Sequence, residues 1–109
     1  MGKPVTITLD HDLGIAGARQ RIDEQFDSLK ESITGNMMLK FDRHWEGDRM
    51  SFTARGMGQK VSGDIDIFPK HVRIVIILPT ILASMAEAVK GRVEKKGQIL
   101  LEDKSKAKT

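Results

Sequence analysis

The sequence of 109 residues predicts an α+β fold, with a five-stranded antiparallel sheet and two helices on one of its faces. The most apolar run, residues 71–78 (HVRIVIIL), is rich in the β-branched residues that favour strands. Short alternating segments separated by tight turns predict the other strands, and two long segments with apolar residues every three or four positions predict the helices. We expect a single domain over residues 4–102.

Composition limits the class of protein. The absence of cysteine excludes disulfides and cysteine-bound metals and fits a reducing compartment. No apolar signal segment opens the chain, and no apolar run approaches the ~20 residues of a membrane span, so we expect a cytoplasmic protein with no membrane span. The net charge of +3 comes partly from a lysine-rich tail, residues 103–109, which we expect to be disordered. Because no aromatic residues are interleaved with these lysines, we do not expect a nucleic-acid partner.

The N-terminal third predicts a strand followed by a helix. Residues 4–10 alternate between apolar and polar, which is typical of a half-buried strand. Asp12 is a candidate N-cap for a helix over residues 15–33, and Gly35 suits the left-handed position that ends such a helix. The apolar stripe of this helix consists of Ile15, Ala18, Ile22, Phe26, Leu29 and Ile33.

The middle of the chain predicts an antiparallel meander of four strands, at residues 37–45, 50–56, 60–68 and 71–78. Gly63 interrupts an inward-facing row of apolar residues, which indicates a bulge, a bend or the close approach of another element. Pro79 ends the last of these strands because it has no N–H to donate.

A second helix is predicted over residues 80–100, with Thr80 as its N-cap. Gly91 and Gly97 lie inside its pattern, where each either permits close packing or bends the helix. If the first strand pairs with residues 71–78, the strand order becomes 1-5-4-3-2 and all neighbours are antiparallel. With both helices on one face, this arrangement resembles a shortened helix-grip fold.

The sequence shows no catalytic or metal-binding pattern. His11, His44 and His71 lack the spacing of a metal site, and no serine lies in a nucleophile elbow. Asp64 and Asp66 share one strand face, as acid pairs can, but alternating aspartates are ordinary on the wet side of an antiparallel strand. We therefore expect a protein that is not an enzyme and binds no metal or cofactor.

Two surface regions are candidate partner-binding sites. The segment RHWEGDR holds the only tryptophan, Trp45, which either closes one end of the core or anchors a partner together with Arg43 and Arg49. On the face that the helices leave open, Val75 and Ile77 form a small β-branched patch among polar side chains. This patch predicts a homodimer in which the same surface meets itself.

A series of short motifs makes the chain similar to a known family. The motifs are His11-Asp12-Leu13-Gly14, Ala18-Arg19-Gln20-Arg21-Ile22, Trp45-Glu46-Gly47-Asp48-Arg49, Gly58-Gln59-Lys60-Val61-Ser62-Gly63, Leu78-Pro79, Lys90-Gly91-Arg92-Val93-Glu94 and Gly97-Gln98-Ile99-Leu100-Leu101. In this order they resemble the polyhydroxyalkanoic acid system family, small bacterial proteins linked to the gene region for polyhydroxyalkanoate granules. The resemblance covers residues 4–102 and departs at Gly17, where an acidic residue is more usual, and at the variable turn 34–36.

The resemblance implies a cytoplasmic bacterial protein of the storage granules and supplies no catalytic residues. The first hypothesis is a non-enzymatic accessory protein that binds a polyhydroxyalkanoate granule surface or a granule protein. The alternative is a helix-grip-like binding module for an apolar acyl or lipid ligand, held between the sheet and the long helix. The small residues expected to leave room for that ligand are Ala54, Gly56, Gly63 and Ala86.

Overall fold

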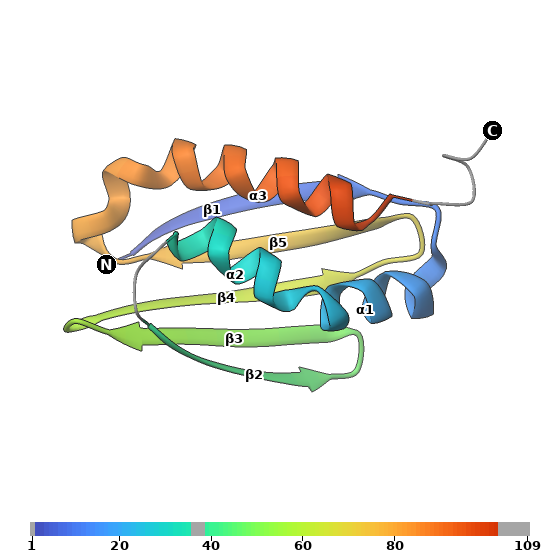
Figure 1. The fold of residues 1–109 in the computed structure, drawn as a ribbon, viewed down its shortest axis with the longest axis horizontal. Coiled ribbons are helices and arrows are strands. Elements are labelled where there is room, and N and C mark those ends of the chain that lie inside the picture. Colours follow the sequence, from blue (N-terminus) through green and yellow to red (C-terminus); the bar gives the residue numbers. More distant parts are fainter. Residues whose placement is uncertain (1, 36–38, 103–109) are drawn as a thin grey trace.

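One antiparallel sheet carries the fold, and the helices cover one of its faces (Figure 1). The computed structural model describes residues 2–35 and 39–102. The strands are β1 (Lys3–Asp10), β2 (Lys40–Glu46), β3 (Arg49–Gly56), β4 (Gln59–Ile67) and β5 (His71–Leu78). Their order is β1-β5-β4-β3-β2 with antiparallel neighbours throughout, which confirms the predicted sheet. Positions 37 and 38 of the predicted second strand, and the predicted disordered tail 103–109, lie outside the described residues.

The helical layer differs from the prediction of two continuous helices. It contains α1 (Gly14–Glu24), α2 (Phe26–Thr34), the 3-10 segment η1 (Thr80–Met85) and α3 (Ala86–Leu100). Gln25, with φ −105° and ψ 18°, leaves the helical region and separates α1 from α2. The N-cap positions of α1 and η1 are Leu13 and Pro79, so the predicted caps at Asp12 and Thr80 are wrong.

Packing explains the break between α1 and α2 and the 3-10 form of η1. Phe26, the first residue of α2, packs edge-on against Phe41 of β2 at 5.9 Å and Phe52 of β3 at 5.8 Å between ring centroids. A bend before Phe26 lets both helix segments keep their apolar stripe on a sheet that twists beneath them. Segment η1 has no fully buried residue and packs on the core only through the partly buried Leu82, whereas α3 buries five residues, so packing favours the α-helical form less in η1 than in α3.

The core lies between the helices and the inward face of the sheet, where apolar residues alternate along the strands. In β3 and β5 these are Met50, Phe52, Ala54, Val72, Ile74, Ile76 and Leu78. Strand pairing runs without a bulge through Gly63, where an added Cβ would lie 2.5 Å from Phe52 Cζ and 2.7 Å from the Val75 carbonyl oxygen. Gly63 and, against Leu9, Gly97 are therefore positions of close packing. Within the described residues, no helix is long and apolar enough to cross a membrane.

Candidate functional site

The structure divides the five predicted partner-binding residues among three places. Arg43 and Trp45 lie at the edge strand β2, on the face that the helices cover, where both contact α1. Arg49 lies on the open face of the sheet at its β2–β3 end. Val75 and Ile77 lie near the middle of the open face, on β5. They therefore do not form one surface.

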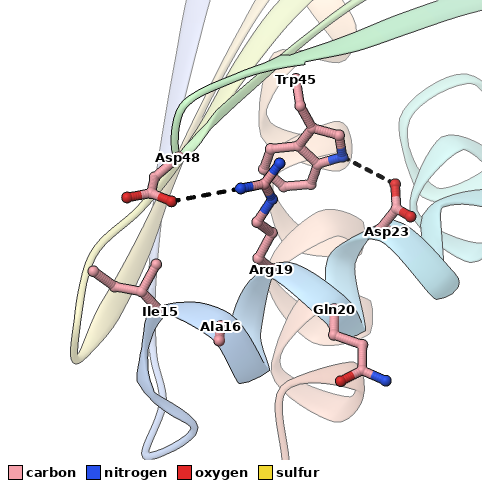
Figure 2. A pocket seen from close by; sticks show the side chains of 7 residues that line it. All are labelled: Ile15, Ala16, Arg19, Gln20, Asp23, Trp45 and Asp48. Atoms are coloured by element: carbon pink, nitrogen blue, oxygen red, sulfur yellow. Dashed lines mark hydrogen bonds and ion pairs between the residues drawn. The ribbon is translucent and has the colours of Figure 1, made fainter.

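Trp45 is held against the core by residues of α1 (Figure 2). Its indole Nε1 donates a hydrogen bond to Asp23 Oδ1 at 3.0 Å, and the Arg19 guanidinium lies 4.4 Å from the ring centroid. Arg19 Nη1 also lies 3.8 Å from Asp48 Oδ1 in the β2–β3 turn, so the hairpin and the helix are joined at two points. These contacts agree with the interpretation that Trp45 closes one end of the core.

Arg43 contacts the same residue, Asp23, that accepts the hydrogen bond from Trp45. Its Nη1 donates to the Asp23 carbonyl oxygen at 3.2 Å and lies 3.8 Å from Asp23 Oδ1, while its guanidinium lies 4.7 Å from the Phe26 ring centroid. Asp23 therefore organises this edge of the molecule. Asp23 lies outside the apolar stripe of the predicted helix, and that stripe does not indicate a contact between Asp23 and a strand more than twenty residues away.

A shallow groove of about 560 Å³ opens beside Trp45, between α1 and the β2–β3 hairpin (Figure 2). Its lining residues are Ile15, Ala16, Arg19, Gln20, Asp23, Trp45 and Asp48. The lining combines an aromatic ring, two aliphatic side chains and charges of both signs. A groove that is open along its length suits an extended segment of a partner better than a small molecule, which is usually enclosed on most of its surface.

The open face of the sheet carries charged side chains in cross-strand rows, which follow from the pairing register. One row, which we call the mixed row, consists of Glu46, Arg49, Asp66 and Arg73, opposite one another across four strands. At the other end of the same strands, the basic row consists of Lys40, Arg55 and Lys60. Between the rows, Val75 is half-buried beside Thr6 and Asp64, and Ile77 is 36% exposed.

The mixed row is an ion-pair network centred on Asp66. Arg49 Nε donates to Asp66 Oδ1 at 2.6 Å, and Arg73 Nη2 donates to Asp66 Oδ2 at 3.4 Å. The hydrogen bond from Arg49 lowers the pKa of the Asp66 carboxyl below its usual range, and the same bond raises the pKa of Arg49. Arg49 is therefore paired with a carboxylate of its own chain, and its role in partner binding stays a prediction.

The histidines do not meet. His11 is buried; its Nδ1 accepts the Leu13 N–H at 3.1 Å, which leaves Nε2 to donate to the Phe68 carbonyl oxygen at 3.0 Å. His44 lies on β2 and His71 on β5, with two strands between them. Among the residues that the structure describes, no three potential metal ligands cluster.

Three of the four residues expected to leave room for an apolar ligand are packed into the fold, and the fourth, Gly56, is half-buried at the end of β3. Ala54 and Ala86 are buried in the core, and the Phe52 ring lies where a side chain at position 63 would be. Two further grooves lie on the outer surface, one beside α1 and α2 at the end of α3 and one between α2 and α3. Ala54, Gly63 and Ala86 therefore do not leave the space expected for an apolar ligand.

Comparison with known proteins identifies the family of the chain from its sequence. No curated protein matches the chain, and no solved structure does, so the helix-grip resemblance stays a prediction. A family model does match, over residues 5–101, and it agrees with the resemblance that the motifs indicate. Because this match covers nearly the whole chain, the protein belongs to the family described as "putative polyhydroxyalkanoic acid system protein".

Proposed function

We propose that this protein is a non-enzymatic, cytoplasmic accessory protein of polyhydroxyalkanoate storage, which docks on a granule-bound protein through the groove beside Trp45. The observation that carries the proposal is the groove itself, a preformed surface on a chain of this family. The family name supports the place of action, and the groove supports the mode of action.

The composition of the groove is that of a protein-binding surface. Tryptophan and arginine are enriched among residues whose truncation weakens protein interfaces most. Trp45 and Arg19 are stacked, and each also has a polar contact, to Asp23 and Asp48 respectively. Because these two side chains are already ordered, they lose little further conformational entropy when a partner binds.

A groove-filling substitution tests the proposal without removing any of these contacts. Ala16 lines the groove and is exposed, so Ala16→Arg places a long side chain in the groove without changing the core. The exposed Ala88 on α3 offers a matched control, Ala88→Arg. In cells that accumulate the polymer, we expect the wild type and Ala88→Arg to sediment with purified granules and Ala16→Arg to remain in the supernatant.

Two results would overturn the proposal. If the wild type never sediments with granules and deletion of the gene leaves the polymer content unchanged, the protein has no role in storage. If Ala16→Arg sediments as well as the wild type, docking does not use the groove.

A further inference from the structure

The β3–β4 turn has a residue that its backbone disfavours. The turn consists of Met57 and Gly58, with φ of 54° and 74°, and two central residues of positive φ define the type I′ hairpin turn. Asparagine, aspartate and glycine favour the first position of this turn, because other side chains crowd the backbone there. Within residues 2–35 and 39–102, Met57 is the only non-glycine residue with positive φ.

The side chain of Met57 is not packed into the fold. It is 77% exposed, more than any other large apolar side chain in the described part of the chain. The opposite hairpin, by contrast, uses Gly47 and Asp48, which are ordinary turn residues. Met57 has an unfavourable backbone conformation and exposes an apolar side chain to water, so the stability of the fold does not explain its presence. Backbone outliers of this kind cluster at functional sites.

The basic row flanks this turn on the open face. Arg55 lies directly opposite Lys40 on β2 and Lys60 on β4, an arrangement in which like charges repel. Within the described residues, none of the three forms an ion pair with a carboxylate. At the other end of the same strands, the charges of the mixed row alternate in sign and pair around Asp66. The basic row has no such alternation, so its three positive charges are left for an anionic partner.

Segment η1 adds exposed apolar residues at the same end of the molecule. In Figure 1 the β3–β4 turn and η1 both lie at the left end, beyond the sheet. Ile81 of η1 is 69% exposed, and Met85 is 40% exposed. This end therefore combines apolar tips with a row of cations, whereas the Trp45 groove lies at the opposite end of β3.

We propose that the β3–β4 hairpin binds an anionic phospholipid surface, with Met57 inserted at the boundary of the acyl chains and the basic row against the head-group phosphates. An apolar tip among cations matches this interface, where each lysine or arginine adds to the attraction and the apolar side chain leaves water. A single-stranded nucleic acid is a poorer match, because the row contains no aromatic ring on which bases stack. The inference extends the proposed function and does not depend on it.

Co-sedimentation of the purified full chain with vesicles tests this inference. We expect the wild type to bind vesicles made of a mixture of phosphatidylglycerol and phosphatidylcholine and not to bind vesicles of phosphatidylcholine alone. Added salt should dissociate it from the mixed vesicles. Met57→Asn should weaken binding about tenfold, because one apolar side chain no longer leaves water. Lys60→Ser should weaken it about fivefold.

Matched controls separate this surface from general charge and hydrophobicity. Ile99 and Lys95 are exposed on α3, so Ile99→Asn and Lys95→Ser should bind vesicles as the wild type does. Met57→Asn should also raise the thermal unfolding midpoint, since asparagine suits the turn, which excludes misfolding as the cause of lost binding.

Three outcomes would overturn the inference: no binding of the wild type to anionic vesicles, equal binding to neutral vesicles, or unchanged binding by Met57→Asn and Lys60→Ser. Binding of an oligonucleotide instead of vesicles, lost in Lys60→Ser, would assign the basic row to nucleic acid. None of these outcomes bears on granule association through the Trp45 groove, because Ala16→Arg tests that proposal separately.

Discussion

At the scale of single residues, buried polar contacts join segments that are distant in the chain. His11 is the clearest case. Besides its two side-chain bonds, its backbone N–H donates to the Lys70 carbonyl oxygen at 2.9 Å, so one residue ties the segment after β1 to the β4–β5 turn. The sequence showed a histidine in a turn; its role as a connector depends on Phe68, which lies 57 positions away.

Removal of the His11 side chain should destabilise the protein. His11→Ala deletes two hydrogen bonds in a buried setting, and we expect the free energy of unfolding to fall by about 2 kcal/mol. Urea denaturation monitored by circular dichroism measures the change. His44 is exposed on the edge strand, so His44→Ala should change stability by less than about 0.5 kcal/mol, and an equal loss in both variants would contradict this role for His11.

The carboxyl of Asp66 should make stability depend on pH in the acid range. Its pKa is lowered in the folded state, chiefly by the hydrogen bond from Arg49, so the folded protein holds this proton less tightly than the unfolded chain does. The stabilisation is complete above the unfolded pKa of ~3.9 and is lost as the pH falls through the folded-state value. In Asp66→Asn, unfolding free energy should therefore fall less steeply with acid than in the wild type.

Asp27 supplies the control for this pH dependence. Its side chain is 91% exposed, and among the described residues its ion pair is with Lys30 of the same helix at 3.3 Å, an interaction that contributes little. Asp27→Asn should leave the acid limb of the stability curve as in the wild type. If Asp66→Asn also leaves it unchanged, the mixed row does not contribute to stability.

At the scale of elements, glycines with the same sequence signal have opposite roles. Gly63 in β4 lies under the Phe52 ring and beside the Val75 carbonyl, whereas Gly91 in α3 has no atom within 4 Å of an added Cβ. Both were simply glycines inside a regular pattern. The difference between them depends on what lies across the interface, which a local pattern does not contain.

Alanine substitutions should reveal this difference in sign. Gly63→Ala places a methyl group against a backbone oxygen and a packed ring, and should lower the free energy of unfolding by about 2 kcal/mol. Gly91→Ala meets open space in a helix and should raise it by about 1 kcal/mol. Thermal and urea unfolding measure both, and a stabilised Gly63→Ala would refute the close packing of β4.

At the scale of the whole molecule, the open face of the sheet remains the predicted site of self-association. We propose a dimer in which Val75 and Ile77 meet their equivalents, because Ile77 is a large hydrophobic side chain on a strand of the sheet with 36% of its surface accessible. Sedimentation equilibrium at high micromolar concentration should show a dimer for the wild type and a monomer for Ile77→Lys. A monomeric wild type would refute the proposal, and a dimer that survives the substitution would move the contact to the edge strand β2.

The sequence by itself determined the sheet and the family. Strand alternation is a local pattern, and short turns force consecutive strands to be antiparallel neighbours, so the order β1-β5-β4-β3-β2 followed once β1 was paired with β5. The motifs along nearly the whole chain were likewise sufficient to indicate the family.

Only the tertiary structure decided how the helices break and where the surfaces form. The bend at Gln25 follows from the packing of Phe26 on two strands, and the groove depends on Asp23 meeting Trp45. The basic row exists because pairing register brings Lys40 opposite Arg55, a residue fifteen positions away. Each of these features is a contact between distant segments, and its energy depends on distances that the pattern of residues along one segment does not specify.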